Sequence, residues 1–384
     1  MSSNDHPHCL DPCRRRVLLA AGAALAMPAS YANAQPRAVG ERIRLAHWLD
    51  ASPDQQEISR DYATGVRLAV NDFNRGAKRA VQLVNFESDG SPASVRNTVQ
   101  TIRKDPTLCA LIGTAGERLA LDSIEAARAE GLQIAHIAPW LSDSRYDRDR
   151  DVVTLFASRE AQIRHALKNL ESMGIGDIGL VYSSEREFAS LHTGVELAAG
   201  ALKLRSVVFA PKASEDIAAL ATRVATSSPV VLLFLGETIE LSQFAQALST
   251  RRVQRYVVSL ADIDVGMLVQ LGAGRSLPMI LTQVVPNPQT SNVPAVRDYR
   301  ALLKAQFDEK PSHISLAGYL GARYAMQSLA GIDRAVTREA VLEAIGQRTS
   351  IDVGGFQLGF SAQQRRGSTY VTQTLLTSDG RMVG

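Results

Sequence analysis

Residues 109–131 read CALIGTAGERLALDSIEAARAEG. The apolar run at 109–112 predicts a strand, which stops at the loop GTAG (113–116), and a helical pattern begins at about Glu117. A strand that passes through glycines into a helix leaves backbone N–H groups free beside the positive end of the helix dipole. This stretch therefore predicts a strand–loop–helix unit whose loop holds a small molecule.

The same alternation of strand and helix extends along the chain from Arg42. Strand-like apolar runs occur at 43–48, 81–86, 108–112 and 133–137, and a helical pattern follows each of the first three. After Phe156 a second series begins, with a helix at about 160–173, strands at 178–182, 206–209 and 230–235, and a helix at 217–226. Such alternation specifies parallel sheets that are covered on both faces. We therefore predict an α/β fold of two similar lobes, each a mainly parallel sheet with helices on both faces.

A linker follows the second series. It reads QVVPNPQTSNVP (283–294) and has three prolines without helical period. Beyond it the patterns predict helices at about 294–307, 312–330 and 338–346, and strands at 355–360 and 370–376.

The composition excludes some classes of partner. The chain has 384 residues and a formal net charge of +3, and no basic block is interleaved with aromatic residues. Nucleic-acid binding proteins carry concentrated positive charge, so we expect no nucleic-acid partner.

The N-terminus has the order of a secretory signal peptide. Arg14–Arg16 precede the apolar run Val17–Met27, and Ala32-Asn33-Ala34 follows. We predict cleavage after Ala34, which removes residues 1–34 and leaves a periplasmic protein. The arginines resemble a twin-arginine signal, but Cys13 stands where Ser or Thr is usual, so both export routes remain open. Of the three cysteines only Cys109 would remain, and its apolar surroundings predict a small buried side chain.

No pattern of catalytic or metal-binding residues occurs in the chain. GxGxxG, GK[ST], GxSxG, HExxH and paired CxxC motifs are all absent, and the histidines are scattered. We therefore expect a binding protein and not an enzyme, with no cofactor and no metal. Parallel sheets bind small ligands at the carboxyl ends of their strands. Here those loops are 49–56, 114–118 and 139–144 in the first lobe, and 183–187, 236–240 and 260–264 in the second.

Several of these stretches resemble one known family. They are GVRLAVNDFNRG (65–76), VQLVNFESDGSPASVRNTVQTIRKDPTLCALIGTAG (81–116), GLQIAHIAPWLSDS (131–144), SLAGYLGARYAMQSLAGI (315–332) and GGFQLGFSAQQRRGSTYVTQTLLTSDGRMV (354–383). In order and spacing they are similar to the type I periplasmic solute-binding proteins of ABC importers, of the branched-chain amino-acid (Leu/Ile/Val-binding) kind.

The resemblance implies a fold, a partner and a binding site. The chain would cross between lobes three times, with the first lobe at 41–157 plus 284–355 and the second at 158–283 plus 356–384. It would work as a monomer that captures a small solute by hinge closure and delivers it to a membrane permease. The matching ligand-binding positions are Thr114, Ala115, Glu117, Trp140, Leu141, Ser142, Phe188, Thr238 and Asp262.

One loop departs from the amino-acid binders of that family. Glu117 and Arg118 stand where serines or threonines are usual. Glu117 would repel a ligand carboxylate, whereas Arg118 could hold an acid; alternatively both belong to a solvated first helical turn. The ligand therefore stays open among an amino acid and a related amide, urea or carboxylate. Trp140 either faces the ligand or packs under its loop. A ligand-sensing domain of the same fold, not coupled to transport, is the alternative function.

Overall fold

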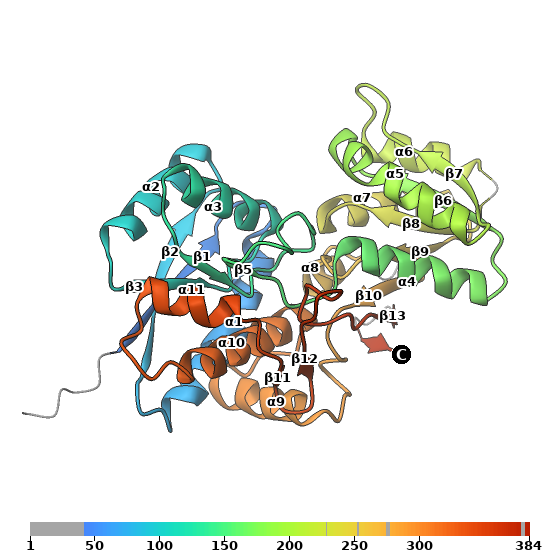
Figure 1. Cartoon of the computed structure of the whole chain (residues 1–384). Helices are drawn as coiled ribbons and strands as arrows, with labels where there is room; N and C mark the ends of the chain where they lie inside the picture. The colour runs from blue at the N-terminus through green and yellow to red at the C-terminus, as the bar shows by residue number, and fades with distance from the viewer. Residues whose placement is uncertain (1–41, 228, 252, 274–276, 378–380) are drawn as a thin grey trace, which may run out of the picture. The chain divides into compact units, whose positions relative to one another are not determined.

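The computed structural model describes residues 42–227, 229–251, 253–273, 277–377 and 381–384 (Figure 1). The predicted signal peptide at 1–34 and its cleavage site lie outside the described residues.

The first sheet has five parallel strands in the order β2-β1-β3-β4-β5. They are β1 (Ile43–Asp50), β2 (Val81–Ser88), β3 (Leu108–Ile112), β4 (Ala135–Ile137) and β5 (Val152–Val153). All residues of β3 are buried, as expected for a central strand covered on both faces. The opening stretch therefore lies in the middle of this sheet.

Helices cover both faces of the first sheet (Figure 1). On one face lie α2 (Pro92–Lys104) and α3 (Glu117–Ala129), and on the other α1 (Gln56–Asn74), α9 (Pro294–Gln306), α10 (His313–Ala330) and α11 (Arg338–Gly346). Successive side chains of β1 enter different cores, because Leu45 packs with α1 and α10 whereas Ala46 packs with α2 and α3. Alternate side chains of β1 thus pack against the helix layers on the two faces of the sheet.

The second sheet has seven strands in the order β14-β13-β10-β9-β8-β6-β7. They are β6 (Asp177–Tyr182), β7 (Arg205–Phe209), β8 (Val231–Leu235), β9 (Tyr256–Ser259), β10 (Met279–Gln283), β13 (Thr372–Leu376) and β14 (Met382–Val383). The first five are parallel, whereas β13 pairs antiparallel with β10 and with β14. This mainly parallel sheet has α4 (Arg159–Ser172) and α5 (Glu185–Ala201) on one face. On the other are α6 (Ile217–Ala225), α7 (Thr238–Ser249) and α8 (Val265–Gln270).

Two glycines let α1 and α10 approach closely. A Cβ at Gly65 would lie 1.8 Å from the Ser315 carbonyl oxygen, and one at Gly318 would lie 2.1 Å from the Tyr62 carbonyl oxygen. Any side chain at either position would push the helices apart. Both glycines belong to stretches that resemble the family, and they bring two helices about 250 residues apart in the chain into contact. Local sequence does not constrain a contact at that separation.

The predicted α/β fold of two parallel-sheet lobes is confirmed, and several details differ from expectation. Strands β9 and β10 and the short β5 were not predicted as elements, and the strand expected at 355–360 is only β12 (Gln357–Leu358), paired with β11 (Ile351–Asp352). The strand at 370–376 runs antiparallel to its neighbours. Cys109 is buried as predicted, and burial raises the pKa of its thiol to about 11.

Candidate functional site

A pocket lies where the carboxyl ends of strands from both sheets meet. Its lining residues are Gln55, Ile58, Glu117, Arg118, Trp140, Arg159, Arg186, Glu187, Leu191, Leu235, Gly236, Glu237, Leu260, Asp262 and Ile263. They lie at or after the ends of β1, β3, β4, β5, β6, β8 and β9, and strand ends are where open α/β sheets bind ligands. The cavity has a volume of about 40 Å³.

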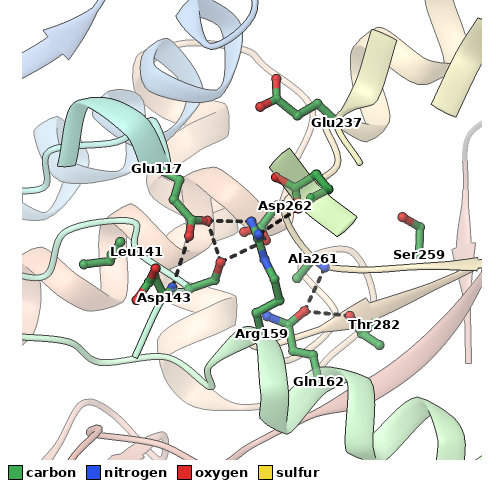
Figure 2. A network of polar contacts seen from close by, with 12 residues as sticks. Glu117, Leu141, Asp143, Arg159, Gln162, Glu237, Ser259, Ala261, Asp262 and Thr282 are labelled. Carbon is green, nitrogen blue, oxygen red and sulfur yellow. Dashed lines mark hydrogen bonds and ion pairs between the residues drawn. The ribbon is translucent and has the colours of Figure 1, made fainter. Parts of the chain in front are cut away.

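Arg159 stands at the centre of the charged part of the pocket (Figure 2). Its Nη2 lies 2.8 Å from Glu117 Oε2 and 3.7 Å from Asp262 Oδ2, and its Nη1 lies 3.1 Å from Glu187 Oε2. Burial alone would lower the pKa of Arg159, but the three carboxylates raise it above its usual range. The guanidinium is therefore a permanent positive charge that links residues following β3, β6 and β9.

Glu117 ties this cluster to the loop after β4. Besides Arg159, its carboxylate accepts hydrogen bonds from Ser142 Oγ at 2.5 Å and from the Asp143 backbone N–H at 3.2 Å (Figure 2). The backbone that carries Glu117 depends on a glycine, because Gly116 has φ 104° and a Cβ there would lie 2.6 Å from Asp50 Oδ2. The glycine-rich loop thus places Glu117 at the start of α3.

The environment of Asp262 disfavours its charged form. Burial and the negative charge of Glu117 raise its pKa to about 6, although Arg159 and the Ser142 hydroxyl act in the opposite direction. Ser142 Oγ lies 3.2 Å from Asp262 Oδ2 as well as 2.5 Å from Glu117 Oε2. One hydroxyl proton can serve only one of these carboxylates, so both contacts are hydrogen bonds only when one of the two acids carries a proton of its own.

The helix that carries Arg159 also fixes the loop that carries Asp262. Gln162 Oε1 accepts from the Ala261 backbone N–H at 2.9 Å and from Thr282 Oγ1 at 2.7 Å (Figure 2). On the other side of this loop, the Ala261 carbonyl accepts from His313 Nε2 at 3.0 Å. These buried contacts hold Asp262 near Arg159 in a defined position.

The apolar side of the pocket is built on Trp140. This indole is 5% exposed, and its ring centroid lies 5.9 Å from those of both Tyr62 and Phe156. Trp140 therefore packs under its loop and also lines the pocket, so the two expectations for this residue are not alternatives.

The structure brings together only some of the predicted site residues. Glu117, Trp140 and Asp262 line the pocket, and Ser142 contacts both acids. Thr114 and Ala115 are buried in the strand-to-helix loop, where the Thr114 carbonyl accepts from the Trp140 N–H at 2.9 Å and Ala115 forms a bridge to Trp140.

The other three predicted residues do not line this pocket. Leu141 is buried against α3. The Phe188 ring stacks on His192 at a centroid distance of 4.4 Å, and Thr238 Oγ1 accepts from the Asp264 backbone N–H at 2.9 Å. Phe188 therefore packs within its own helix, and Thr238 fixes the loop that follows β9.

Arg159 and Glu187 were not among the predicted site residues. Arg159 is the first residue of α4, directly after the N-cap Ser158. A cation is unfavourable at the positive end of a helix dipole. An arginine directly after an N-cap serine therefore indicates that its side chain pairs with groups outside its own helix. This pattern could have identified Arg159 as a candidate site residue.

In the part of the chain that the structure describes, no three His, Cys, Asp or Glu side chains are grouped so that they could hold a metal ion. No helix in the same residues combines the length and apolarity needed to cross a membrane.

Solved structures show the same fold. A substrate-binding periplasmic protein from Ralstonia solanacearum is 22% identical, with a TM-score of 0.78 over 89% of this chain and 99% of the other. A fatty acid ABC transporter substrate-binding protein from Thermomonospora curvata is 13% identical, with a TM-score of 0.75 over 89% and 91%. A branched-chain amino acid transporter substrate binding protein from Streptococcus pneumoniae, in complex with isoleucine, is 12% identical, with a TM-score of 0.72 over 89% and 98%.

In sequence, no curated protein matches the chain. The family model described as periplasmic binding protein matches residues 42–381, nearly the whole of the described chain. This match confirms the expectation of a binding protein and not an enzyme. The chain belongs to the periplasmic binding protein family.

Proposed function

We propose that this chain is the periplasmic solute-binding component of an ABC importer, and that it captures a small polar solute in the pocket around Arg159. The observation that carries the proposal is the pocket itself, because charged and apolar side chains from the strand ends of both sheets converge on it. Family membership and the transport roles named for the similar structures support the same function.

The size of the cavity supports capture by hinge closure. About 40 Å³ has room for roughly three water molecules, and a solute of amino-acid size needs more. The surrounding loops would have to move apart for a solute to enter and then close around it. Small-angle scattering should show a smaller radius of gyration with saturating solute, and an unchanged radius would contradict closure.

We propose the boundaries of the two lobes from the points at which the chain leaves one sheet for the other. The chain leaves the first sheet after β5 and the second sheet after β10, and it returns to the second sheet at β13. Phe356 and Leu358 pack in the same core as α1 and α10, and Arg366 and Gly367 still bond to first-lobe carbonyls, so we propose that the last crossing lies at about 368–371 and not at 355–356.

Export and delivery complete the proposed function. We propose cleavage after Ala34, release into the periplasm and recognition of the loaded monomer by a membrane permease. Intact-mass measurement of the exported protein should give an N-terminus at Gln35. A mature mass that retains residues 1–34 would contradict this step.

The decisive experiment is to recover the solute. Protein purified from a periplasmic extract should be examined by native mass spectrometry, and any released compound should be titrated back by calorimetry. We expect one compound per chain, recovered chemically unchanged. Failure to recover any solute, together with no binding in a broad screen of polar metabolites, would overturn solute capture.

A further inference from the structure

We infer that the solute is an organic cation: a molecule that carries an ammonium or amidinium group and has no carboxylate of its own. This inference rests on the proposed function, because it concerns the charge of the same pocket.

The enclosed part of the pocket has more negative than positive charge. Its acidic side chains are 18% (Glu117), 10% (Glu187) and 23% (Asp262) exposed, and they share one guanidinium, that of Arg159, which is 17% exposed. With all groups ionised, three carboxylates and one guanidinium leave two negative charges in excess. Charge removed from water is unfavourable unless it is paired, so this pocket is complementary to a cation.

The other arginines that line the pocket do not balance this charge. Arg118 is 59% exposed, pairs with Asp122 and donates to the Gly90 carbonyl. Arg186 is 66% exposed and lies 3.8 Å from Glu187. Both are largely in water, where solvent and salt screen their charge.

The places that could receive a ligand carboxylate already hold acids of this chain. A helix N-terminus is the usual backbone site for an anion. Here Glu117 is the first residue of α3, Glu187 lies in the first turn of α5, and Glu237 is the N-cap residue of α7. At α7 a second acid is present, because Glu240 Oε2 accepts from the Glu237 backbone N–H at 2.9 Å. A solute with its own carboxylate would meet negative charge at each of these three helices.

Arg159 has one further donor that a neutral acceptor on the solute could reach once the surrounding loops move apart. Arg159 Nε is buried and has no hydrogen-bond partner among the described residues. A carbonyl or hydroxyl oxygen on the solute could accept from it without adding negative charge. Apolar side chains (Ile58, Trp140, Leu191, Leu235, Leu260 and Ile263) line the same pocket and would contact the carbon skeleton.

Matched probes can test the charge requirement directly. For each of the alanine, leucine and phenylalanine skeletons, thermal-shift and calorimetric titrations at pH 7.5 should compare four compounds: the simple amine, the amino-acid amide, the parent amino acid and the deaminated acid. We expect the amine and the amide of one skeleton to bind most tightly, with the parent amino acid at least about tenfold weaker because of its added charge.

The outcomes separate this inference from the function on which it rests. Stronger binding of the amino acid or the acid would overturn the cation inference and leave solute capture intact. The same holds if the compound recovered from the periplasm is an anion or a zwitterion. No binding by any amine or amide, while another solute class binds, also overturns the inference, and no binding by any compound in either experiment overturns both.

Charge-neutral variants test which residues hold the cation. Glu117→Gln and Asp262→Asn should each weaken binding of the best amine roughly 10- to 100-fold, because each removes one charge-assisted contact. Glu171→Gln on α4 is the matched control, since it removes a carboxylate that is exposed and outside the pocket. If one variant fails to fold, the other and the probe series still decide. Unchanged affinity in both folded variants would overturn the assignment.

Discussion

Arg159 and Arg366 are both largely enclosed, yet the chain holds them in different ways. Arg366 Nε donates to Asp147 at 2.8 Å, and its two terminal nitrogens donate to four main-chain carbonyls, those of Leu141, Ser142, Asp143 and Phe156. Arg159 has three carboxylates around it and leaves Nε without a partner among the described residues.

The difference separates a structural arginine from one that belongs to a binding site. A guanidinium has five N–H donors, and at Arg366 all five have acceptors within the chain. Nothing is left there for a ligand. At Arg159 the hydrogen bonds are incomplete and the surrounding charge is unbalanced, which is the condition in which an added molecule improves the local interactions.

The largest effect is expected from Arg366→Met. The substitution leaves Asp147 and four carbonyl groups without their buried donor, so the free energy of unfolding should fall by about 3–5 kcal/mol. Urea denaturation checks this, with the exposed neighbour Arg365→Met as control. A loss below about 1 kcal/mol would mean that water replaces the guanidinium, and the contrast with Arg159 would not hold.

A smaller effect with a different pH profile is expected from Arg159→Met. The variant leaves three carboxylates to repel one another, and we expect a loss of about 1–3 kcal/mol at pH 7.5. The loss should shrink at pH 5, because protonation of Asp262 removes part of the repulsion. The Arg366→Met loss should change less with pH, because four of the five acceptors of Arg366 are main-chain carbonyls, which do not titrate. Denaturation of both variants at the two pH values, with Arg164→Met on α4 as the exposed control, measures this. Equal pH profiles would contradict the distinction.

The next prediction concerns Asp262 itself. Its pKa is raised to about 6 in the folded state from an ordinary value of 3.8, so the folded protein holds this proton more tightly than the unfolded chain does. Its contribution to stability is therefore fully present below pH 4 and is lost as the pH rises through about 6. Charged or polar groups from several elements face it: Glu117, Ser142, Arg159 and Glu187.

The variant Asp262→Asn isolates this contribution. Wild type should gain on the order of 1–2 kcal/mol relative to Asp262→Asn between pH 7.5 and 4.5. NMR titration of the Asp262 carboxyl carbon gives the pKa independently. A pKa at or below 4 would show that Arg159 outweighs burial and Glu117.

The smallest effect is expected from Ser142→Ala. It removes a hydroxyl group that lies within hydrogen-bond distance of two acids, at a cost of about 1 kcal/mol in stability. Ser144→Ala in the same loop, where the hydroxyl is exposed, is the control. A loss as large as that of Arg159→Met would mean that the hydroxyl, and not the guanidinium, organises the two acids.

Local sequence patterns were sufficient to predict the fold because each element follows from its own residues. The run LCALI at 108–112 is a fully buried strand, and α2 begins at Ser91-Pro92, an N-cap serine followed by proline, with Ser91 Oγ accepting from the Ser94 N–H at 3.3 Å. Strands β9 and β10 were missed because each is only four or five residues long and follows a stretch without a clear helical pattern.

The site was predicted only in part, because its chemistry depends on residues far apart in the chain. Glu117 and Asp262 were identified as ligand-binding positions from the family resemblance. Their shared counter-ion, Arg159, lies 42 residues after Glu117 and 103 residues before Asp262 in the chain, so no sequence spacing connects the three. The three carboxylates around Arg159 lie close together only in the folded chain, where the strand ends of the two sheets meet.

The single buried thiol has a practical consequence. Among the described residues Cys109 is the one cysteine, it is 1% exposed, and burial raises its pKa to about 11, so it reacts slowly with maleimides and other thiol reagents near neutral pH. A cysteine introduced on the surface beside the pocket would then be the preferred site for a fluorophore. With the proposed cleavage after Ala34, which removes Cys9 and Cys13, the chain would be a scaffold for attaching one environment-sensitive fluorophore beside the pocket.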